Sequence, residues 1–313
     1  MICPTCGFDQ TKKAGRSPSG NQRYRCKRKT CGRIWSDAVK NPKLLYFDIE
    51  TSHTLFRAWR PGQQYIADRQ IIQDWFTLSW SAKWVCTTSM FSYVIRPKEV
   101  KHQDDKRIVT ALWNLFNEAD IIIGHNSDSF DIKKMNRRFI YHGLKPPKPY
   151  KTVDTLKIAW RVMGKGCNSL DYLVKYFSLG DGKIKMHEED WIACEAGDPK
   201  ALRKMSKYND RDVLLGESIY LLLRAWDSRH PNLGLYYETT SPRCKNCGSR
   251  DLDIDDKARV YTPANVWFCW TCENCGANGR TPESARYERA EGDKWDKKII
   301  REENKDKRLS LMR

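Results

Sequence analysis

The clearest hydrophobic pattern in the chain is an apolar run at residues 44–47 that continues into Asp48-Ile49-Glu50. This segment, KLLYFDIE, predicts a buried strand. Because alternate side chains of a strand share a face, Asp48 and Glu50 should point to the same spot. Two neighbouring carboxylates repel each other, and a divalent cation between them would remove the conflict. When this segment is considered alone, the alternative to a metal site is that Asp48 begins a turn and Glu50 is exposed.

A second pattern, in residues 119–143, combines a strand, a turn and a helix. Asp120–Ile123 predicts a strand and Gly124–Asn126 the turn that leaves it. Apolar residues at helical spacing then predict an amphipathic helix that starts near Asp131. Asp131 or Asp128 would suit a helix N-terminus, so a purely structural role is the alternative for either carboxylate.

A third pattern predicts a long helix that begins with Asp198 as N-cap and Pro199 as first residue. Its core-facing stripe consists of Leu202, Met205, Tyr208/Asn209, Asp212, Gly216, Ile219 and Leu223. Asp212 therefore falls on the buried face, where an uncompensated carboxylate is costly, and Tyr208 lies one turn earlier on that face. A structural salt bridge is the alternative for Asp212. Asp210 lies off the stripe and is expected to be solvated.

The net charge of the chain indicates the class of its binding partner. The 313 residues contain 56 Lys+Arg against 39 Asp+Glu, a formal charge of +17, which favours a polyanion such as nucleic acid. No apolar stretch approaches the roughly 20 residues of a membrane helix, and the N-terminus has no apolar segment typical of a secretory signal. We therefore expect a soluble, cytoplasmic (intracellular) protein without membrane association.

Nine of the twelve cysteines cluster at the two ends of the chain, and only Cys86, Cys167 and Cys194 lie in between. In an intracellular protein such clusters favour zinc over disulfides. The N-terminal cluster consists of Cys3, Cys6, Cys26 and Cys31. Four thiolates in two close pairs suit a tetrahedral structural Zn²⁺. A redox CxxC is the alternative, weakened by the absence of a flanking strand–helix pattern. The stretch GNQRYRCKRKTCGRIW resembles the zinc ribbons at the N-terminus of some bacterial transposases.

The same N-terminal segment is strongly basic. Residues 1–43 carry eleven Lys/Arg and two Asp, which accounts for +9 of the total charge. Basic side chains neutralise phosphates and aromatic rings stack on exposed bases. We therefore expect nucleic-acid contact, with a solvated basic face as the alternative; the candidate residues are Arg23, Tyr24, Arg25, Lys27, Arg28 and Lys29.

The C-terminal cluster offers five cysteines for four zinc positions. The repeated CxxCG pattern favours Cys244, Cys247, Cys272 and Cys275 and leaves Cys269 out, with Cys269/Cys272 as the alternative second pair. The surroundings of this second ribbon are less basic, so contact with a protein partner and contact with DNA both stay open.

The three acidic segments together resemble a known family. FDIET, HNSDSFD and YNDRD are similar, in order and approximate spacing, to the exonuclease motifs of the DnaQ-like DEDD superfamily. Asn126-x3-Phe130-Asp131 and Tyr208-x3-Asp212 match its Tyr variant (DEDDy), as in the proofreading domains of family B DNA polymerases. The histidine variant would have His at position 207, where this chain has Lys207. The resemblance covers roughly residues 44–226.

This resemblance implies an α/β protein with an RNase H-like mixed sheet flanked by helices. Segments 75–84 and 87–95 would pair with the first strand as a meander, 104–119 would be the crossing helix, and 120–126 the fourth strand. The expected domains are a basic zinc ribbon at 1–43, the exonuclease domain at 44–240, a second zinc ribbon at 241–280 and a charged tail at 281–313. The tail, with ten Lys/Arg and eight Asp/Glu, suits a solvated helix or a disordered segment.

The resemblance also implies an activity, a metal-dependent 3′–5′ exonuclease acting on nucleic acid, with single-stranded DNA favoured over RNA. Two Mg²⁺ or Mn²⁺ ions would be held by Asp48, Glu50, Asp131 and Asp212, while two Zn²⁺ ions would stabilise the ribbons. Tyr208 would orient the attacking water, and Asn126 and Phe130 would contact the terminal nucleotide. The alternatives are an inert nucleic-acid-binding protein on a nuclease scaffold, a structure-specific endonuclease and an RNA exonuclease.

Overall fold

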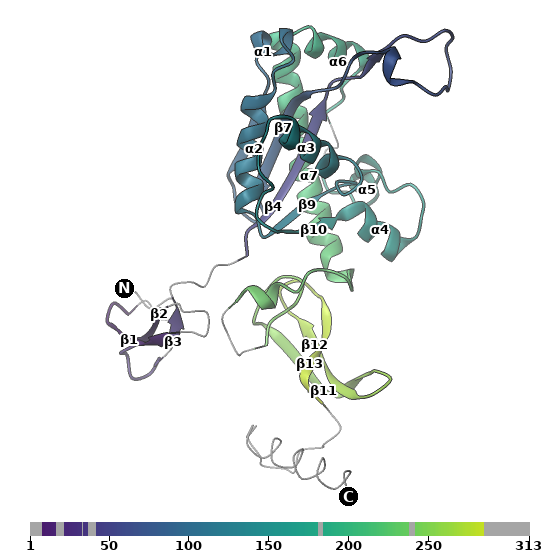
Figure 1. The fold of residues 1–313 in the computed structure, drawn as a ribbon. Coiled ribbons are helices and arrows are strands. Elements are labelled where there is room, and N and C mark those ends of the chain that lie inside the picture. Colours follow the sequence, from purple (N-terminus) through teal and green to yellow (C-terminus); the bar gives the residue numbers. More distant parts are fainter. Residues whose placement is uncertain are drawn as a thin grey trace, which may run out of the picture.

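The computed structural model describes residues 8–16, 22–32, 34–36, 42–180, 184–237 and 242–284 (Figure 1). Cys3 and Cys6 of the predicted N-terminal zinc site lie outside the described residues. So does the predicted charged tail, except for residues 281–284. Within the described ranges, no helix has the length and apolar character needed to cross a membrane.

A five-stranded mixed sheet forms the centre of the molecule, in the order β10-β9-β4-β7-β8. Its strands are β4 (Leu44–Thr51), β7 (Thr77–Trp84), β8 (Met90–Val94), β9 (Ile121–Gly124) and β10 (Lys151–Asp154). Strands β4, β7 and β8 form an antiparallel meander, whereas β9 runs parallel to both β4 and β10. This confirms the predicted α/β class with an RNase H-like sheet.

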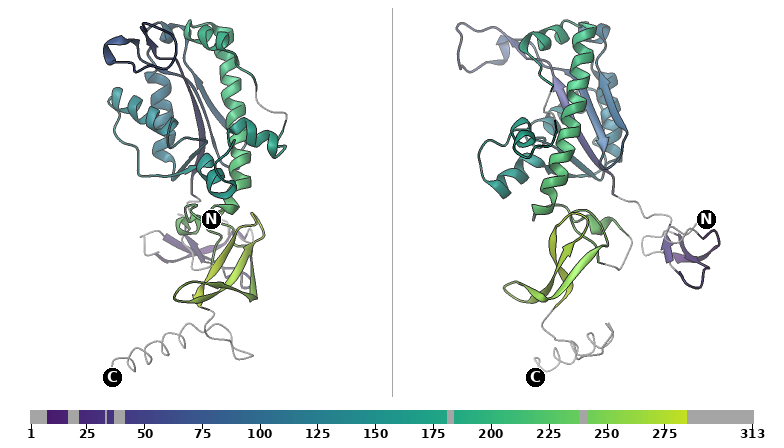
Figure 2. Two further views of the ribbon diagram at one scale, coloured as in Figure 1. Left: turned by 90° about the vertical axis from the view of Figure 1, so that its right-hand side faces the viewer. Right: turned by 180° about the vertical axis from the view of Figure 1, so that it is seen from behind.

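Helices cover both faces of the sheet, as the two views in Figure 2 show. Helices α2 (Lys106–Glu118) and α3 (Asp131–Tyr141) pack on the face that carries Phe47 and Ile49. Helix α7 (Pro199–Leu223) crosses the other face, with α4 (Thr155–Met163) and α5 (Leu170–Tyr176) beside it. Smaller elements complete the domain: α1 (Pro97–Lys101), α6 (Glu188–Glu195), and a hairpin of β5 (Leu55–Phe56) and β6 (Ile71–Gln73).

Helix α7 begins as its sequence predicts and packs closely on β4. The Asp198 carboxylate caps it by accepting hydrogen bonds from the N–H groups of Lys200 and Ala201, at 2.8 and 2.7 Å. In mid-helix, Gly216 lies against Tyr46, where an added Cβ would sit only 2.0 Å from the tyrosine hydroxyl oxygen. Glycine is needed here because the helix must approach the strand closely. This contact fixes the height of α7 above Asp48 and Glu50, which share the strand face of Tyr46.

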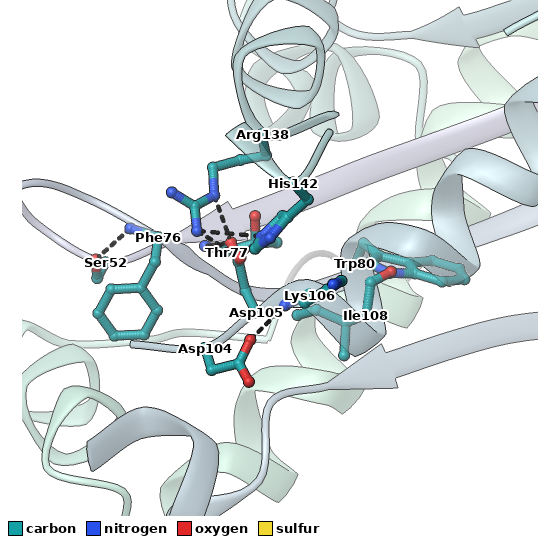
Figure 3. A network of polar contacts seen from close by, with 10 residues as sticks. All are labelled: Ser52, Phe76, Thr77, Trp80, Asp104, Asp105, Lys106, Ile108, Arg138 and His142. Atoms are coloured by element: carbon teal, nitrogen blue, oxygen red, sulfur yellow. Dashed lines mark hydrogen bonds and ion pairs between the residues drawn. The ribbon is translucent and has the colours of Figure 1, made fainter. Parts of the chain in front are cut away.

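A buried polar network fixes α3 against the sheet (Figure 3). The fully buried Asp105 carboxylate accepts hydrogen bonds from Thr77 N at 2.8 Å and from the Arg138 guanidinium at 2.5 and 2.8 Å. His142 Nε2 lies 2.6 Å from the same carboxylate. The network therefore joins β7, the start of α2 and the second half of α3.

Replacing Asp105 by asparagine should destabilise the domain strongly, because it leaves the Arg138 guanidinium buried without a compensating charge. We expect the free energy of unfolding in urea to fall by roughly 3–5 kcal/mol. Asp74→Asn is the matched control, since Asp74 pairs with the neighbouring Arg137 on the exposed side of α3. That change should cost about 0–1 kcal/mol. Equal losses in the two variants would contradict this account of the network.

Small three-stranded antiparallel sheets form from the two cysteine-rich ends. The N-terminal sheet contains β1 (Thr11–Arg16), β2 (Gln22–Cys26) and β3 (Ile34–Ser36). The C-terminal sheet contains β11 (Leu252–Tyr261), β12 (Val266–Cys272) and β13 (Asn278–Ser284). Strand β13 extends four residues past the predicted end of the ribbon, because its pairing with β12 continues to Ser284.

The C-terminal sheet is attached to the end of α7 through backbone groups. Helix α7 runs into a 3₁₀ turn at Arg224–Trp226. Buried Asn246 donates hydrogen bonds from its side-chain amide to the carbonyls of Arg224 and Asp227. In addition, Leu233 N donates to Lys245 O at 2.7 Å. These contacts connect the ribbon to the same helix that carries Tyr208 and Asp212.

Candidate functional site

Three acidic side chains meet where α7 crosses β4. Asp48 and Glu50 project from β4 and Asp212 from α7, and one carboxylate oxygen of each lies within 4.8 Å of the others. The strand pattern predicts the first pair and the helical stripe predicts the third. Asp212 is buried, whereas Asp48 and Glu50 are half-buried. Negative charge is therefore concentrated on one side of the sheet.

Asp131 lies beside this group but is not one of the three. It is the first residue of α3, is 4 % exposed, and accepts a long hydrogen bond of 3.4 Å from Ile49 N, between the two acidic residues of β4. Burial raises the pKa of the Asp131 carboxyl to about 7. A bound cation would favour its ionised form.

Buried Asn209 orients one of these carboxylates. Its side-chain Nδ2 donates a 2.7 Å hydrogen bond to Asp48 Oδ2. This hydrogen bond restrains the orientation of the Asp48 carboxylate within the acidic group. Sequence reasoning assigned no role to Asn209, although its position on the core-facing stripe of α7, where an amide needs a polar partner, was a usable signal.

Tyr208 lies over the acidic group as a neutral hydrogen-bond donor. Burial, followed by the negative charges of Asp212 and Glu50, raises the pKa of the Tyr208 hydroxyl far above its usual range. Its ring meets Trp191 of α6 edge to face, with centroids 6.4 Å apart. The hydroxyl therefore stays protonated at neutral pH, so it can orient a water molecule but not act as a general base in this state.

The exposed rim of the site contains the residues predicted to contact a nucleotide. Phe130 is 42 % exposed, and Asn126 is exposed in the turn after β9 with a positive φ of 61°. Lys134, one turn into α3, places its Nζ 4.5 Å from the Phe130 ring and 2.9 Å from Thr51 Oγ1. Lys134 was missed in the sequence, although it lies three residues after Asp131 on the same helix.

Asp154 holds the turn that carries Asn126. Its Oδ1 accepts hydrogen bonds from Asn126 N at 2.9 Å and from Leu156 N at 3.0 Å, so it caps α4 and anchors the turn together. Asp128 forms an ion pair with Lys157 at 2.7 Å. Asp154 and Asp128 therefore stabilise the turn and the start of α4, and neither is among the three clustered carboxylates.

The structure contradicts the prediction that Asp210 is solvated. Asp210 Oδ1 accepts hydrogen bonds from Ser81 on β7, at 2.6 Å, and from Ser92 on β8. The helical stripe alone missed this because α7 lies across the sheet, so residues on the flank of its apolar face also reach strand side chains. Asp210 binds α7 to β7 and β8 of the meander, and it is not among the three clustered carboxylates.

The acidic group fits a pair of hard divalent cations. Its donors are all carboxylate oxygens, which Mg²⁺ and Mn²⁺ prefer over the sulfur and nitrogen ligands typical of zinc. The charges of Asp48, Asp131 and Asp212 also contribute, after burial, to raising the pKa of Tyr46 beneath the site. Such a concentration of like charge is stabilised by a cation.

The C-terminal cysteines fit a zinc ion. Sulfur atoms of Cys244, Cys247, Cys272 and Cys275 all lie within 4.8 Å of one another, and Cys269 is not among them. The Sγ atoms of Cys244 and Cys275 are 3.6 Å apart, and so are those of Cys247 and Cys272. Four sulfurs about 2.3 Å from a tetrahedral centre would be spaced by about 3.8 Å, whereas a disulfide spans about 2.05 Å. A hydrogen bond with Cys244 lowers the pKa of Cys247 to about 4, which favours a thiolate.

The N-terminal ribbon is described in part. Arg23, Tyr24 and Arg25 lie on β2, and Arg25 and the loop residues 27–29 are exposed. Cys26 is buried and Cys31 half-buried. Gly32 has a positive φ of 55°, which suits a turn directly after Cys31. The described part thus provides two thiols next to an exposed basic loop.

A protein-family model agrees with this fold. Residues 84–224 match the family model RNase_H_2, of the RNase_H superfamily, over less than half of the chain. No curated protein sequence matches. Among solved structures, the family B DNA polymerase of the hyperthermophilic archaeon Pyrobaculum calidifontis is similar, with 14 % identity and a TM-score of 0.44. That match covers 81 % of this chain but only 35 % of the polymerase.

Proposed function

We propose that the chain is a metal-dependent 3′–5′ exonuclease that hydrolyses phosphodiester bonds of nucleic acid, with single-stranded DNA as its preferred substrate. The RNase H-like fold and the superfamily match support a nuclease in general. The observation that carries the proposal is the meeting of Asp48, Glu50 and Asp212 within 4.8 Å, with Asp131 beside them and Tyr208 above them.

The acidic residues would hold two cations. Mg²⁺ or Mn²⁺, when bound, supplies positive charge for the attacking and leaving oxygens of the phosphodiester. Asp48 and Glu50 bind from the strand, while Asp212 and Asp131 bind from the two helices. Asn209 keeps the Asp48 carboxylate in one orientation through its 2.7 Å hydrogen bond. This holds the ligands in position before the substrate arrives.

The residues around the acidic group would bind and orient the substrate. Tyr208 donates a hydrogen bond to the attacking water and so directs its lone pair at the phosphorus. Phe130 offers an exposed ring to the terminal base, and Asn126 lies beside it in the turn held by Asp154. Lys134 places a positive charge next to Phe130, within reach of a phosphate.

The ribbons would have a structural and a binding role. Zn²⁺ bound by Cys244, Cys247, Cys272 and Cys275 would stabilise the C-terminal sheet, and a second Zn²⁺ on Cys3, Cys6, Cys26 and Cys31 the N-terminal one. The basic residues of the N-terminal ribbon, from Arg23 to Lys29, would bind the phosphate backbone without sequence preference.

Replacing Tyr208 by phenylalanine should lower the rate of hydrolysis roughly 100-fold while substrate affinity changes little, because only the water-orienting hydroxyl is lost. Single-turnover rates and oligonucleotide binding, measured separately, test this. Tyr172→Phe on the exposed face of α5 is the control and should keep full activity. A Tyr208→Phe enzyme as fast as wild type would remove the tyrosine from the mechanism.

The direction of hydrolysis is tested by the position of the label. A 5′-labelled single-stranded oligonucleotide should give a ladder that shortens with time, while the same strand labelled at its 3′ end should release a labelled mononucleotide at once. A matched RNA should be degraded more slowly than DNA. Internal fragments from both labels would show an endonuclease and contradict the proposal.

A further inference from the structure

The C-terminal ribbon contains a concavity that plays no part in the proposed hydrolysis. It has a volume of about 810 Å³ and lies between the three strands of the ribbon and the segment at residues 242–245. Its lining includes the cations Arg243, Lys245 and Arg280 and the aromatic residues Trp267 and Trp270, and it contains no Asp or Glu. We call it the ribbon groove.

The floor of the ribbon groove is closely packed. Trp270 is 6 % exposed, and its indole Nε1 donates a 2.7 Å hydrogen bond to the carbonyl of Arg280. The neighbouring Gly279 leaves room for this ring, because an added Cβ would lie 2.0 Å from it. The shape of the groove is therefore fixed by the β12–β13 pairing.

Cations of the ribbon groove are held by aromatic rings and carbonyls. The Arg280 guanidinium lies 4.7 Å from the centre of the Trp267 ring, and Lys245 Nζ lies 3.4 Å from Ser228 O. Within the described ranges, neither Arg280 nor Lys245 forms an ion pair with a carboxylate. Asp255, which shares a cross-strand row with Arg280, accepts hydrogen bonds from the backbone of its own turn. The positive charge of the groove thus remains available to a ligand.

We propose that the ribbon groove binds a stretch of single-stranded nucleic acid. Lysine and arginine side chains neutralise phosphates, and tryptophan and guanidinium planes stack on unpaired bases. Trp267 lines the groove, and its indole Nε1 has no hydrogen-bond partner among the described residues. A duplex keeps its bases stacked inside the helix, where these rings do not reach them.

The ribbon groove is connected to the acidic group through the C-terminal end of helix α7. The ribbon is attached at Arg224 and Asp227, and Arg224 follows Asp212 by twelve residues, or about 18 Å of helix. A strand bound in the groove would therefore be retained by the chain that carries the carboxylates. Binding in the groove does not depend on hydrolysis and is tested separately from it.

The first test compares two matched arginines. Arg280 stacks on Trp267 inside the groove, and Arg259 stacks on Phe268 on the opposite face of β12, at 4.5 Å. Binding of a fluorescent 15-nucleotide oligothymidylate to the zinc-loaded full chain is measured without Mg²⁺ or Mn²⁺. We expect Lys245→Gln/Arg280→Gln to weaken binding roughly tenfold and to lower the salt slope by about 1.4, and Arg259→Gln to change neither. Equal effects of the two sets of changes, or none, would overturn the proposal.

A second measurement needs no variant. Cys269 lines the groove and is half-buried, while Cys86 is exposed on the central domain. Oligothymidylate should slow alkylation of Cys269, followed by mass spectrometry, and leave the rate at Cys86 unchanged. Protection of Cys269 by polyglutamate, without protection by the oligonucleotide, would assign the groove to an acidic protein and overturn the proposal. Loss of hydrolysis with Mg²⁺ would leave these binding results intact, so failure of the exonuclease and failure of the groove are distinguishable.

Discussion

Replacing Asp212 by asparagine is expected to reduce phosphodiester hydrolysis by a factor on the order of 10³ or more. The change keeps the size of the side chain but removes one negative charge from the three carboxylates that meet within 4.8 Å. A cation bound there contributes several kcal/mol to transition-state stabilisation, and each 1.36 kcal/mol corresponds to a factor of ten in rate.

Asp210→Asn is the matched control for Asp212→Asn. Asp210 lies on the same helix, two residues earlier, accepts hydrogen bonds from Ser81 and Ser92, and is not among the three clustered carboxylates. We expect its loss to reduce stability slightly and to leave the rate at saturating Mg²⁺ within a few-fold of wild type. Rates measured with excess enzyme on a 5′-labelled strand decide the comparison. Similar losses in both variants would mean that Asp212 acts through the packing of α7.

Replacing Cys247 by serine is expected to release one zinc ion per chain and to unfold the C-terminal ribbon. The ribbon has a small apolar core, consisting chiefly of Trp270, Ala277 and the cysteines themselves. Zinc binding in such modules contributes about 10–16 kcal/mol, so the sheet should not survive without the ion. Metal analysis and limited proteolysis between residues 242 and 284 would report the loss, and chelation of zinc from wild type should give the same cleavage pattern.

Cys269→Ser is the control for the zinc prediction. Cys269 lies on β12, three residues before Cys272, but is not among the four clustered sulfurs. The variant should keep its zinc and its resistance to protease. Loss of zinc from Cys269→Ser, with retention in Cys275→Ser, would show that the cluster uses Cys269/Cys272 as its second pair of cysteines.

Local sequence patterns predicted those strands and helices that have one face buried along their whole length. The strand 44–51 and the helix 199–223 follow from apolar periodicity, and the positions of Asp48, Glu50 and Asp212 follow from the same periods. Strand β10 was not predicted, because only two of its four residues are buried and it follows a proline-rich segment. Its pairing with β9, not its own composition, makes it a strand.

Contacts between distant segments account for what the sequence could not show. Asn209 and Asp48 are 161 residues apart, and Arg138 and Asp105 are 33 apart. Neither pair follows from a local period, since each depends on how a helix crosses the sheet. The groove in the C-terminal ribbon likewise requires the register of β12 and β13 to bring Arg280 next to Trp267.

The central claim, that the acidic group at β4 and α7 is a metal-dependent nuclease site, is tested most directly by one comparison. Wild-type chain and Asp48→Asn are incubated with single-stranded DNA, each with and without Mg²⁺ or Mn²⁺, and hydrolysis is followed over time. The account predicts degradation by wild type only when the divalent ion is present, and none by Asp48→Asn. Intact DNA in all four reactions, with zinc content and DNA binding retained, would contradict it and leave a nucleic-acid-binding protein on a nuclease fold.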